Sequence, residues 1–240
     1  MALMMPCVSV PSRLTPVAVV RTNAELLQRH MRSRAGGEAT VDIVALEDIV
    51  SESERLGKMV EQMLTLAQTD GDRAALMSST VDMSELGEEV TRAMRALATA
   101  KGIAMQTRAE SKVWVRGDRE RLREALVTLL DNAIKYTDAG GRVDLEVGRA
   151  HRRALITVAD TGSGIPADSL PHIFGRFYRV DKARSRESGG TGLGLSIARH
   201  IVEAHGGSIR IESEVGKGTR AMIELRLASR EHRSGGSEAV

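Results

Sequence analysis

One asparagine and three glycine-rich segments follow one another in the second half of this 240-residue chain. They are Asn132, Asp160-Thr161-Gly162-Ser163-Gly164, Gly190-Thr191-Gly192-Leu193-Gly194 and Gly216-Lys217-Gly218-Thr219. Glycine allows a backbone to approach a ligand closely, and free N–H groups at a helix start bind phosphate. Together these residues supply a metal ligand, a carboxylate and phosphate-binding backbone, so the sequence predicts that the chain binds ATP.

Composition and charge exclude several other classes of protein. Hydrophobic residues make up 42% of the chain and aromatic residues only 2%, so we expect an aliphatic core. Lys and Arg (34) nearly balance Asp and Glu (32), which indicates no nucleic-acid partner. Cys7 is the single cysteine and fits a reducing compartment. No apolar run approaches the roughly 20 residues of a membrane span, so we expect a cytoplasmic chain that reaches a membrane only through a partner.

Residues 1–69 are predicted to form an antiparallel helical hairpin that serves for dimerisation. Apolar residues recur at heptad-like spacing, and Gly36-Gly37 supplies the loop between two helices. The two seams are Val17, Val20, Ala24, Leu27 and Met31, then Leu46, Ile49, Ser53, Leu56, Val60, Met63 and Ala67. Such a hairpin completes a four-helix bundle with a second copy or a homologous chain, as a homodimer or a heterodimer. The alternative is a helical pair packed on its own domain.

Residues 76–228 are predicted to form an α+β two-layer sandwich, a mixed sheet covered on one side. Asp82 and Glu85 resemble a capping box, and Asp118 caps a second helix, which carries Asn132. The apolar face of the first helix is predicted as Leu86, Val90, Ala93 and Leu97. A third helix is predicted over 192–205, and strands over 103–107, 113–115, 142–147, 154–159, 208–212 and 220–227. Residues 229–240 are predicted to be a disordered tail.

Asp160 follows an apolar strand, where an ionised carboxylate needs a hydrogen-bond donor. The exocyclic amine of adenine is such a donor, whereas guanine presents a carbonyl there, so Asp160 would select ATP over GTP. The alternative is an Asp that forms a turn and accepts from the amides of Gly162 and Gly164. Only the company of the other segments favours the nucleotide interpretation.

The predicted helix before the first glycine-rich segment carries further polar side chains. The amide oxygen of Asn132 is a hard ligand suited to Mg²⁺, which also binds substrate phosphates. By helical spacing Lys135 lies on the same face and could reach a phosphate, and Tyr136 could lie against the ribose or base. A dinucleotide site built on Gly162 is rejected because no strand precedes Asp181, the acidic residue at the expected spacing.

The ordered segments resemble the boxes of bacterial two-component sensor histidine kinases, whose ATP-binding fold is shared with DNA gyrase and mismatch-repair ATPases. The likeness covers nearly the whole chain. Residues 129–137 resemble the N box, 160–166 the first glycine box, 173–179 the F box and 189–195 the second glycine box. The resemblance implies Mg-ATP as cofactor and a response regulator as partner.

The resemblance also implies roles for individual residues. Arg179 and Arg184 match positions that contact the terminal phosphates, and residues 182–190 resemble a lid over the nucleotide. Asn132, Lys135, Arg179 and Arg184 would then be catalytic. The nucleotide-binding set would be Tyr136, Asp160, Gly162, Gly164, Gly190, Gly192, Leu193, Gly194 and Thr219.

Three positions depart from the family pattern. Aligning Thr15-Pro16 with the pattern His-Glu-x-x-Thr-Pro puts Pro11 where the phosphoaccepting histidine belongs and Ser12 where the acid belongs. Thr128 replaces a second Asn one turn before Asn132. The sequence therefore predicts a histidine kinase that phosphorylates a histidine on a partner kinase chain. The alternative is a catalytically incomplete ATP-binding module that dimerises with a kinase or docks a response regulator.

Overall fold

The structure, a computed structural model, describes residues 49–50, 53, 57, 79–180 and 191–228. The predicted tail lies outside the described residues. So does the predicted hairpin, apart from Ile49, Val50, Ser53 and Gly57, which are helical as the periodicity predicts. The assignment of dimerisation to residues 1–69 stays a prediction.

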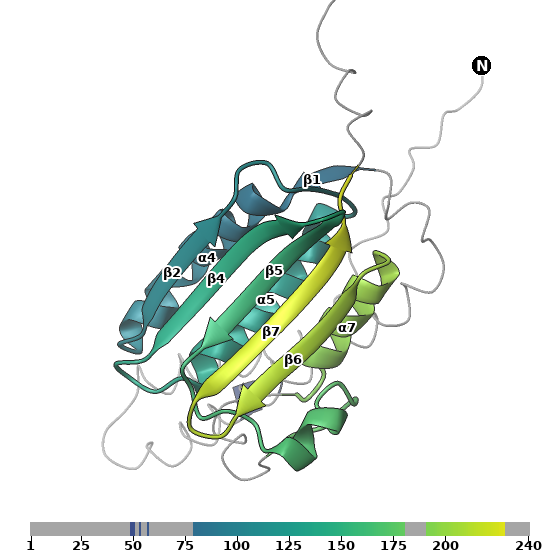
Figure 1. Cartoon of the computed structure of the whole chain (residues 1–240). Helices are drawn as coiled ribbons and strands as arrows, with labels where there is room; N and C mark the ends of the chain where they lie inside the picture. The colour runs from purple at the N-terminus through teal and green to yellow at the C-terminus, as the bar shows by residue number, and fades with distance from the viewer. Residues whose placement is uncertain (1–48, 51–52, 54–56, 58–78, 181–190, 229–240) are drawn as a thin grey trace, which may run out of the picture. The chain divides into compact units, whose positions relative to one another are not determined.

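From residue 79 onward, helices alternate with pairs of strands (Figure 1). The elements are β1 (Thr80–Asp82), α4 (Met83–Ala100), β2 (Ala104–Ala109), β3 (Trp114–Arg116), α5 (Arg119–Tyr136), β4 (Arg142–Ala150), β5 (Arg153–Asp160), the short 3-10 helix η1 (Ala167–His172), α7 (Gly194–Ala204), β6 (Ser208–Glu214) and β7 (Gly218–Arg226). The predicted succession of helices and strand pairs is confirmed, while β1 and η1 were not predicted. Among the described residues, no helix is long and apolar enough to cross a membrane.

Five strands form the main sheet in the order β2-β4-β5-β7-β6. β2 and β4 are parallel, and the other neighbouring pairs are antiparallel. Helices α4, α5 and α7 all lie on one face of this sheet (Figure 1). The opposite face carries charged pairs, for example Arg108 with Glu146 at 3.2 Å. The predicted two-layer sandwich, with a mixed sheet covered on one side, is confirmed. β1 and β3 form a separate antiparallel pair.

The described core lies between the sheet and the helices and is aliphatic, as the composition predicts. Alternate residues of β4 and β5 point into it, among them Leu145 and Ile156. From α5, Leu122, Leu126 and Leu130 are each at most 2% exposed. Burying a side chain of this size contributes about 1.5–3 kcal/mol, so the α5–sheet contact fixes the helix firmly.

Helix α4 begins as predicted, but its buried face differs from the prediction. The Asp82 carboxylate accepts a hydrogen bond from the Ser84 amide at 3.0 Å, which caps the helix. Leu86 and Val90 are buried as predicted, whereas Ala93 and Leu97 are exposed. The core is instead reached at the next position along, by Met94 and Ala98. Residues spaced three or four apart lie on the same helical face almost equally well. The contact with the sheet decides which of the two sets is buried.

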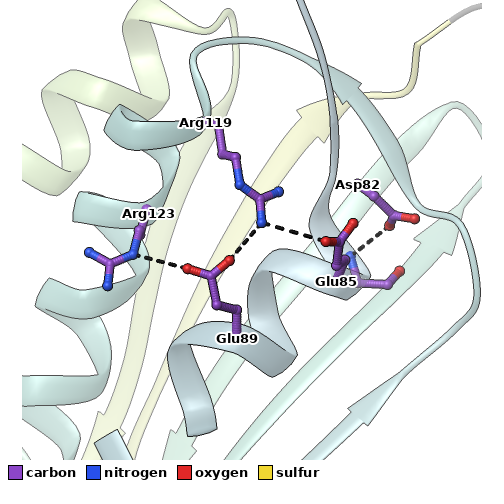
Figure 2. Close-up of polar contacts among 6 residues, drawn as sticks. Asp82, Glu85, Glu89, Arg119 and Arg123 are labelled. Atoms are coloured by element: carbon purple, nitrogen blue, oxygen red, sulfur yellow. Dashed lines mark hydrogen bonds and ion pairs between the residues drawn. The ribbon is translucent and has the colours of Figure 1, made fainter. Parts of the chain in front are cut away.

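Charged side chains join α4 to α5 on the surface (Figure 2). Glu89 accepts from Arg119 at 2.6 Å and from Arg123 at 3.3 Å, and Glu85 lies 3.8 Å from Arg119. The hydrogen bond from Arg119 is the main reason that the pKa of Glu89 is lowered, although desolvation works against it. Exposed pairs of this kind contribute little each, so the network orients the two helices more than it stabilises them.

His205 joins the end of α7 to the start of α5. Its Nδ1 donates to the Ile201 carbonyl at 2.7 Å, and its Nε2 accepts from the Asp118 amide at 3.0 Å. The second bond requires a neutral imidazole. Burial lowers the pKa of His205, in agreement with that neutral form. The position of this residue at a helix end is the one that the sequence predicts.

We predict that His205→Leu lowers the free energy of unfolding by about 1–3 kcal/mol at neutral pH, because the Asp118 amide loses its acceptor. Since the folded pKa of His205 is lowered, its contribution is complete above the unfolded pKa of about 6.5 and is lost as the pH falls below it. Urea unfolding at about pH 7.5 and about pH 5.5 should show the gap between wild type and variant narrowing in acid. An equal gap at both pH values contradicts this account. His151→Asn, at an exposed turn, is the control.

Candidate functional site

Asp160 ends β5, and its carboxylate is held by backbone. Its Oδ1 accepts from the Gly162 amide at 2.9 Å and from the Thr219 amide at 3.1 Å. Burial raises the pKa of Asp160, and the two hydrogen bonds oppose that rise. Within the described ranges, Oδ2 has no hydrogen-bond partner. One oxygen is therefore used for structure and the other is left for a donor from outside the protein.

The first glycine-rich segment is wedged between the end of α5 and the β6–β7 hairpin. A Cβ at Gly162 would overlap the carbonyl oxygen of Tyr136, and one at Gly164 would overlap that of Glu214. Gly164 also has a φ of +70°. The Ser163 amide donates to the Tyr136 carbonyl at 3.1 Å. Glycine is required here because backbone meets backbone, which sets Asp160 directly beside the last turn of α5.

The third glycine-rich segment closes onto the same carboxylate from the other side. A Cβ at Gly218, whose φ is +105°, would overlap the backbone carbonyl of Asp160. The Ser213 hydroxyl donates to the Gly218 carbonyl at 2.8 Å and accepts from the Ile165 amide at 2.8 Å. Ser213 also lies 2.9 Å from the hydroxyl of Thr219. These bonds hold Thr219 beside Asp160 and involve Ser213, a residue that the sequence did not single out. The role of Thr219 in nucleotide binding stays a prediction.

The last two turns of α5 bring Asn132, Lys135 and Tyr136 to this place. The side chain of Asn132 makes no hydrogen bond in the described part of the chain, so its amide oxygen is available as a ligand. The Lys135 ammonium lies 5.4 Å from the centroid of the Tyr136 ring, and that ring is 49% exposed. An exposed ring beside a carboxylate and an ammonium is suited to a flat, charged ligand.

The electrostatics of this cluster favour an anion. Burial lowers the pKa of Lys135, the charge of Asp131 opposes that, and the charges of Arg179 and Lys101 add to the lowering. Burial also raises the pKa of Tyr136. Nε and Nη2 of Arg179 are buried and have no hydrogen-bond partner among the described residues. Unpaired buried donors on a cation are costly, so an anionic acceptor fits them.

The second glycine-rich segment leads into α7 beside the F box. The Phe177 amide donates to the Gly192 carbonyl at 2.9 Å, and a Cβ at Gly192 would lie only 2.9 Å from the Phe177 backbone. Helix α7 starts at Gly194 with no side-chain cap for its first turn. Thr128 of α5 lies against Gly194, where a Cβ would be 3.1 Å from its methyl group. The uncapped helix start is thus close to the helix that carries Asn132.

The chain matches two families. Residues 14–72 match HisKA, the His Kinase A (phospho-acceptor) domain, and residues 117–229 match HATPase_c, the histidine kinase-, DNA gyrase B- and HSP90-like ATPase. Over 185 residues the chain is 38% identical to the sensor histidine kinase RppB of Synechocystis sp., covering 77% of this chain and 41% of RppB. Over 213 residues it is 33% identical to the sensor histidine kinase YkoH of Bacillus subtilis, covering 88% of this chain and 44% of YkoH. The chain belongs to the sensor histidine kinase family.

The chain spans less than half the length of these curated relatives. The structure of this chain is similar to the solved structure of full-length ShkA in complex with AMPPNP, with a TM-score of 0.70 and 28% sequence identity. The similarity covers 91% of this chain and 45% of that one. The HisKA match begins after Pro11, so it leaves the predicted loss of the acceptor histidine untested.

The structure does not describe every residue of the predicted site. Arg184 and Gly190 lie outside the described residues, as does Pro11. Leu193 is only 1% exposed, so its side chain belongs to the protein interior and only its backbone can face a ligand. The alternative of an Asp160 turn held by Gly162 and Gly164 is half right, since the second amide comes from Thr219, 59 residues away in the chain.

A hollow of about 600 Å³ lies beside the F box of the histidine kinase chain. Its lining comprises Pro171, His172, Phe174, Gly175, Arg176, Phe177, Tyr178, Arg179 and Arg199. Among the predicted site residues that the structure describes, Arg179 alone borders it. Most of the lining belongs to the F box, but the sequence analysis did not predict a hollow there.

We predict that Asp160→Asn leaves the free energy of unfolding at pH 7 equal to or above that of wild type. The folded pKa of Asp160 is raised, so its ionisation costs stability as the pH rises from the unfolded value of about 3.9 upward. The neutral amide avoids this cost and can still accept from both backbone amides. Any advantage of the variant should therefore vanish near pH 4. Denaturant unfolding measures it, with Asp168→Asn on exposed η1 as control. A clear loss of stability at pH 7 contradicts the prediction.

Proposed function

We propose that this chain binds Mg-ATP and transfers the γ-phosphoryl group to a histidine on a partner chain. The observation that carries the proposal is the Asp160 carboxylate, with one oxygen held by two amides and the other unpartnered among the described residues. Lys135 and Arg179, which act on each other electrostatically, supply positive charge, and Nε and Nη2 of Arg179 have no partner among the described residues. An acid that can read a base, together with cations for the phosphates, is what an adenine triphosphate requires.

In this proposal, different residues bind the base, the phosphates and the metal ion. Oδ2 of Asp160 accepts from the exocyclic amine of adenine, and the ring of Tyr136 lies against the base or ribose. Lys135 and Arg179 neutralise the phosphates, and the uncapped start of α7 adds backbone amides through Gly192 and Gly194. The amide oxygen of Asn132 suits Mg²⁺, which when bound to the phosphates offsets the charge that builds up during transfer.

In the reaction, an imidazole nitrogen of the acceptor histidine forms a bond to the γ-phosphorus. The bond between that phosphorus and the β,γ-bridging oxygen breaks, and ADP leaves with the electron pair. The attacking nitrogen is the unprotonated one of the neutral imidazole, and the proton of the other ring nitrogen is released to solvent. Lys135 and Arg179 hold the phosphates in line for this step, and Arg184 is proposed to do the same from residues 182–190. The reaction is mostly a matter of positioning and charge.

The partner chain follows from the sequence of this one. Pro11 stands where the alignment expects the acceptor histidine, and proline has no group that accepts a phosphoryl. We therefore propose a homodimer or heterodimer through residues 1–69, with a partner histidine kinase as the source of the histidine and a response regulator as the final acceptor. The chain would act in the cytoplasm and meet the membrane only through its partner.

A second candidate function is an ATP-binding interaction module without transfer. Pro11 and Ser12 favour it, as does Thr128 in place of the second Asn, because an incomplete metal site can bind nucleotide yet fail in catalysis. Such a module would dimerise with a kinase or dock a response regulator through the hairpin.

Labelled ATP distinguishes the two functions. We predict acid-labile phosphohistidine on a candidate partner kinase whose own ATP site has been inactivated, and its loss by about 100-fold or more with Asn132→Ala, since metal-held phosphate is lost. Gln106→Ala, which removes an exposed amide side chain on β2 outside the predicted site and the hairpin, is the control. Partner labelling that does not depend on Asn132 supports the module. Phosphohistidine on this chain alone contradicts the alignment of Pro11.

A further inference from the structure

The C-terminal end of α5 is stabilised by a side chain from another helix. The last four carbonyls of a helix lack intrahelical partners and must find others. In α5 two of them, those of Ile134 and Lys135, accept from the ammonium of Lys101 at 2.8 Å and 2.6 Å. A cation at this end is also favoured by the helix dipole. Lys101 thus acts as a C-cap supplied from 33 and 34 residues away in the sequence.

The other two carbonyls of this turn are satisfied by its own surroundings. The Thr137 hydroxyl donates to the Ala133 carbonyl at 2.7 Å, and the Ser163 amide donates to the Tyr136 carbonyl at 3.1 Å. No glycine ends the helix, because Thr137 is extended. Lys101 is therefore one of three residues that together close the helix, and the one that contributes charge.

Lys101 is itself held in place by its backbone. It caps α4, where its N–H bonds the carbonyls of Leu97 and Ala98. The next residue, Gly102, accepts from the Gly140 amide at 2.8 Å in the loop after α5. Two attachments therefore join the end of α4 to the end of α5, and the lysine side chain spans a fixed distance.

The turn that Lys101 caps carries site residues. The Lys135 carbonyl accepts from the Lys101 ammonium, and the Lys135 ammonium is the group that we propose to bind a phosphate. Tyr136 is the next residue, and its ring lies near that ammonium. Asn132 lies one turn earlier. A change in the direction of this turn moves all three side chains relative to the Asp160 carboxylate, whose Oδ1 is held by the amides of Gly162 and Thr219.

We propose that Lys101 is a positioning residue of the nucleotide site, which acts by holding the carbonyls of Ile134 and Lys135 so that the last turn of α5 presents Lys135 and Tyr136 to the ligand. This inference rests on the proposed function and adds to it a residue outside the family boxes. Lys101 touches the helix backbone and not the ligand, so arginine, which can also donate two hydrogen bonds from a cation, should replace it in large part.

The test compares the full chain with Lys101→Met, Lys101→Arg and the control Lys112→Met, which removes an exposed lysine at the turn before β3. AMPPNP affinity is measured by calorimetry, and amide hydrogen exchange is followed at residues 135–138 and, for reference, at 119–122. Lys101→Met should weaken binding about 10-fold, which is equivalent to about 1.4 kcal/mol. It should also speed exchange at 135–138 while 119–122 stays protected. Lys101→Arg should restore most of both, and Lys112→Met should change neither.

Unchanged AMPPNP affinity in folded Lys101→Met overturns the inference, whether or not exchange at 135–138 is faster. Equal loss in Lys101→Met and Lys101→Arg overturns it too, because a cation with two donors would then not suffice. If Lys101→Met unfolds, Lys101→Gln is read in the same way, since its amide can keep one of the two bonds. A wild-type chain that binds no AMPPNP defeats the proposed function itself, and this inference with it.

Discussion

The site depends on one half-buried carboxylate that three parts of the chain hold. Asp160 is the last residue of β5, the central strand of the sheet. Its carboxylate accepts from the Gly162 amide, two residues on in the chain, and from the Thr219 amide of β7. The glycines at 162, 164 and 218 are needed because any side chain there would overlap a backbone carbonyl. Close backbone packing, rather than a flexible glycine loop, is therefore what these glycines provide. It leaves one carboxylate oxygen for the ligand.

Two helix ends bring the charged groups to that carboxylate. Helix α5 ends beside it with Lys135 and Tyr136, and α7 starts uncapped next to Thr128 of the same helix. At the far end of the pair, His205 ties α7 to the start of α5. This contact thus helps to set the angle between the two helices, and with it the distance between Asn132 and the uncapped start of α7. Long-range hydrogen bonds of this kind are weak singly but fix geometry together.

Local sequence signals predicted most of the fold. Capping residues Asp82 and Asp118, and alternating strands such as 154–159, lie in the structure where the sequence put them. The short strand β1 has three residues, too few for a periodicity. Ala93 and Leu97 were wrongly predicted to lie on the buried face of α4, because apolar spacing alone cannot choose between two neighbouring faces of a helix.

The site was predicted less completely, for a physical reason. Motifs identified Asp160, Lys135 and Thr219, since their neighbours in sequence have a recognisable chemistry. Lys101 and Ser213 were missed because each acts through a bond to backbone far away in the chain, and neither has a local pattern. A side chain that stabilises the end of a helix distant in the sequence leaves no local pattern at its own position, so only the three-dimensional structure reveals it.

If the Asp160 carboxylate accepts a hydrogen bond from the exocyclic amine of adenine, the chain should distinguish ATP from GTP. Calorimetric titration of the full chain with each nucleotide in the presence of Mg²⁺ measures this, with Asp160→Ala titrated in parallel. We expect measurable heat for ATP with wild type, at least about 10-fold weaker binding of GTP, and a loss of ATP affinity of about 10-fold or more in the variant. Equal affinity for the two nucleotides, or an unchanged ATP affinity in Asp160→Ala, would contradict it.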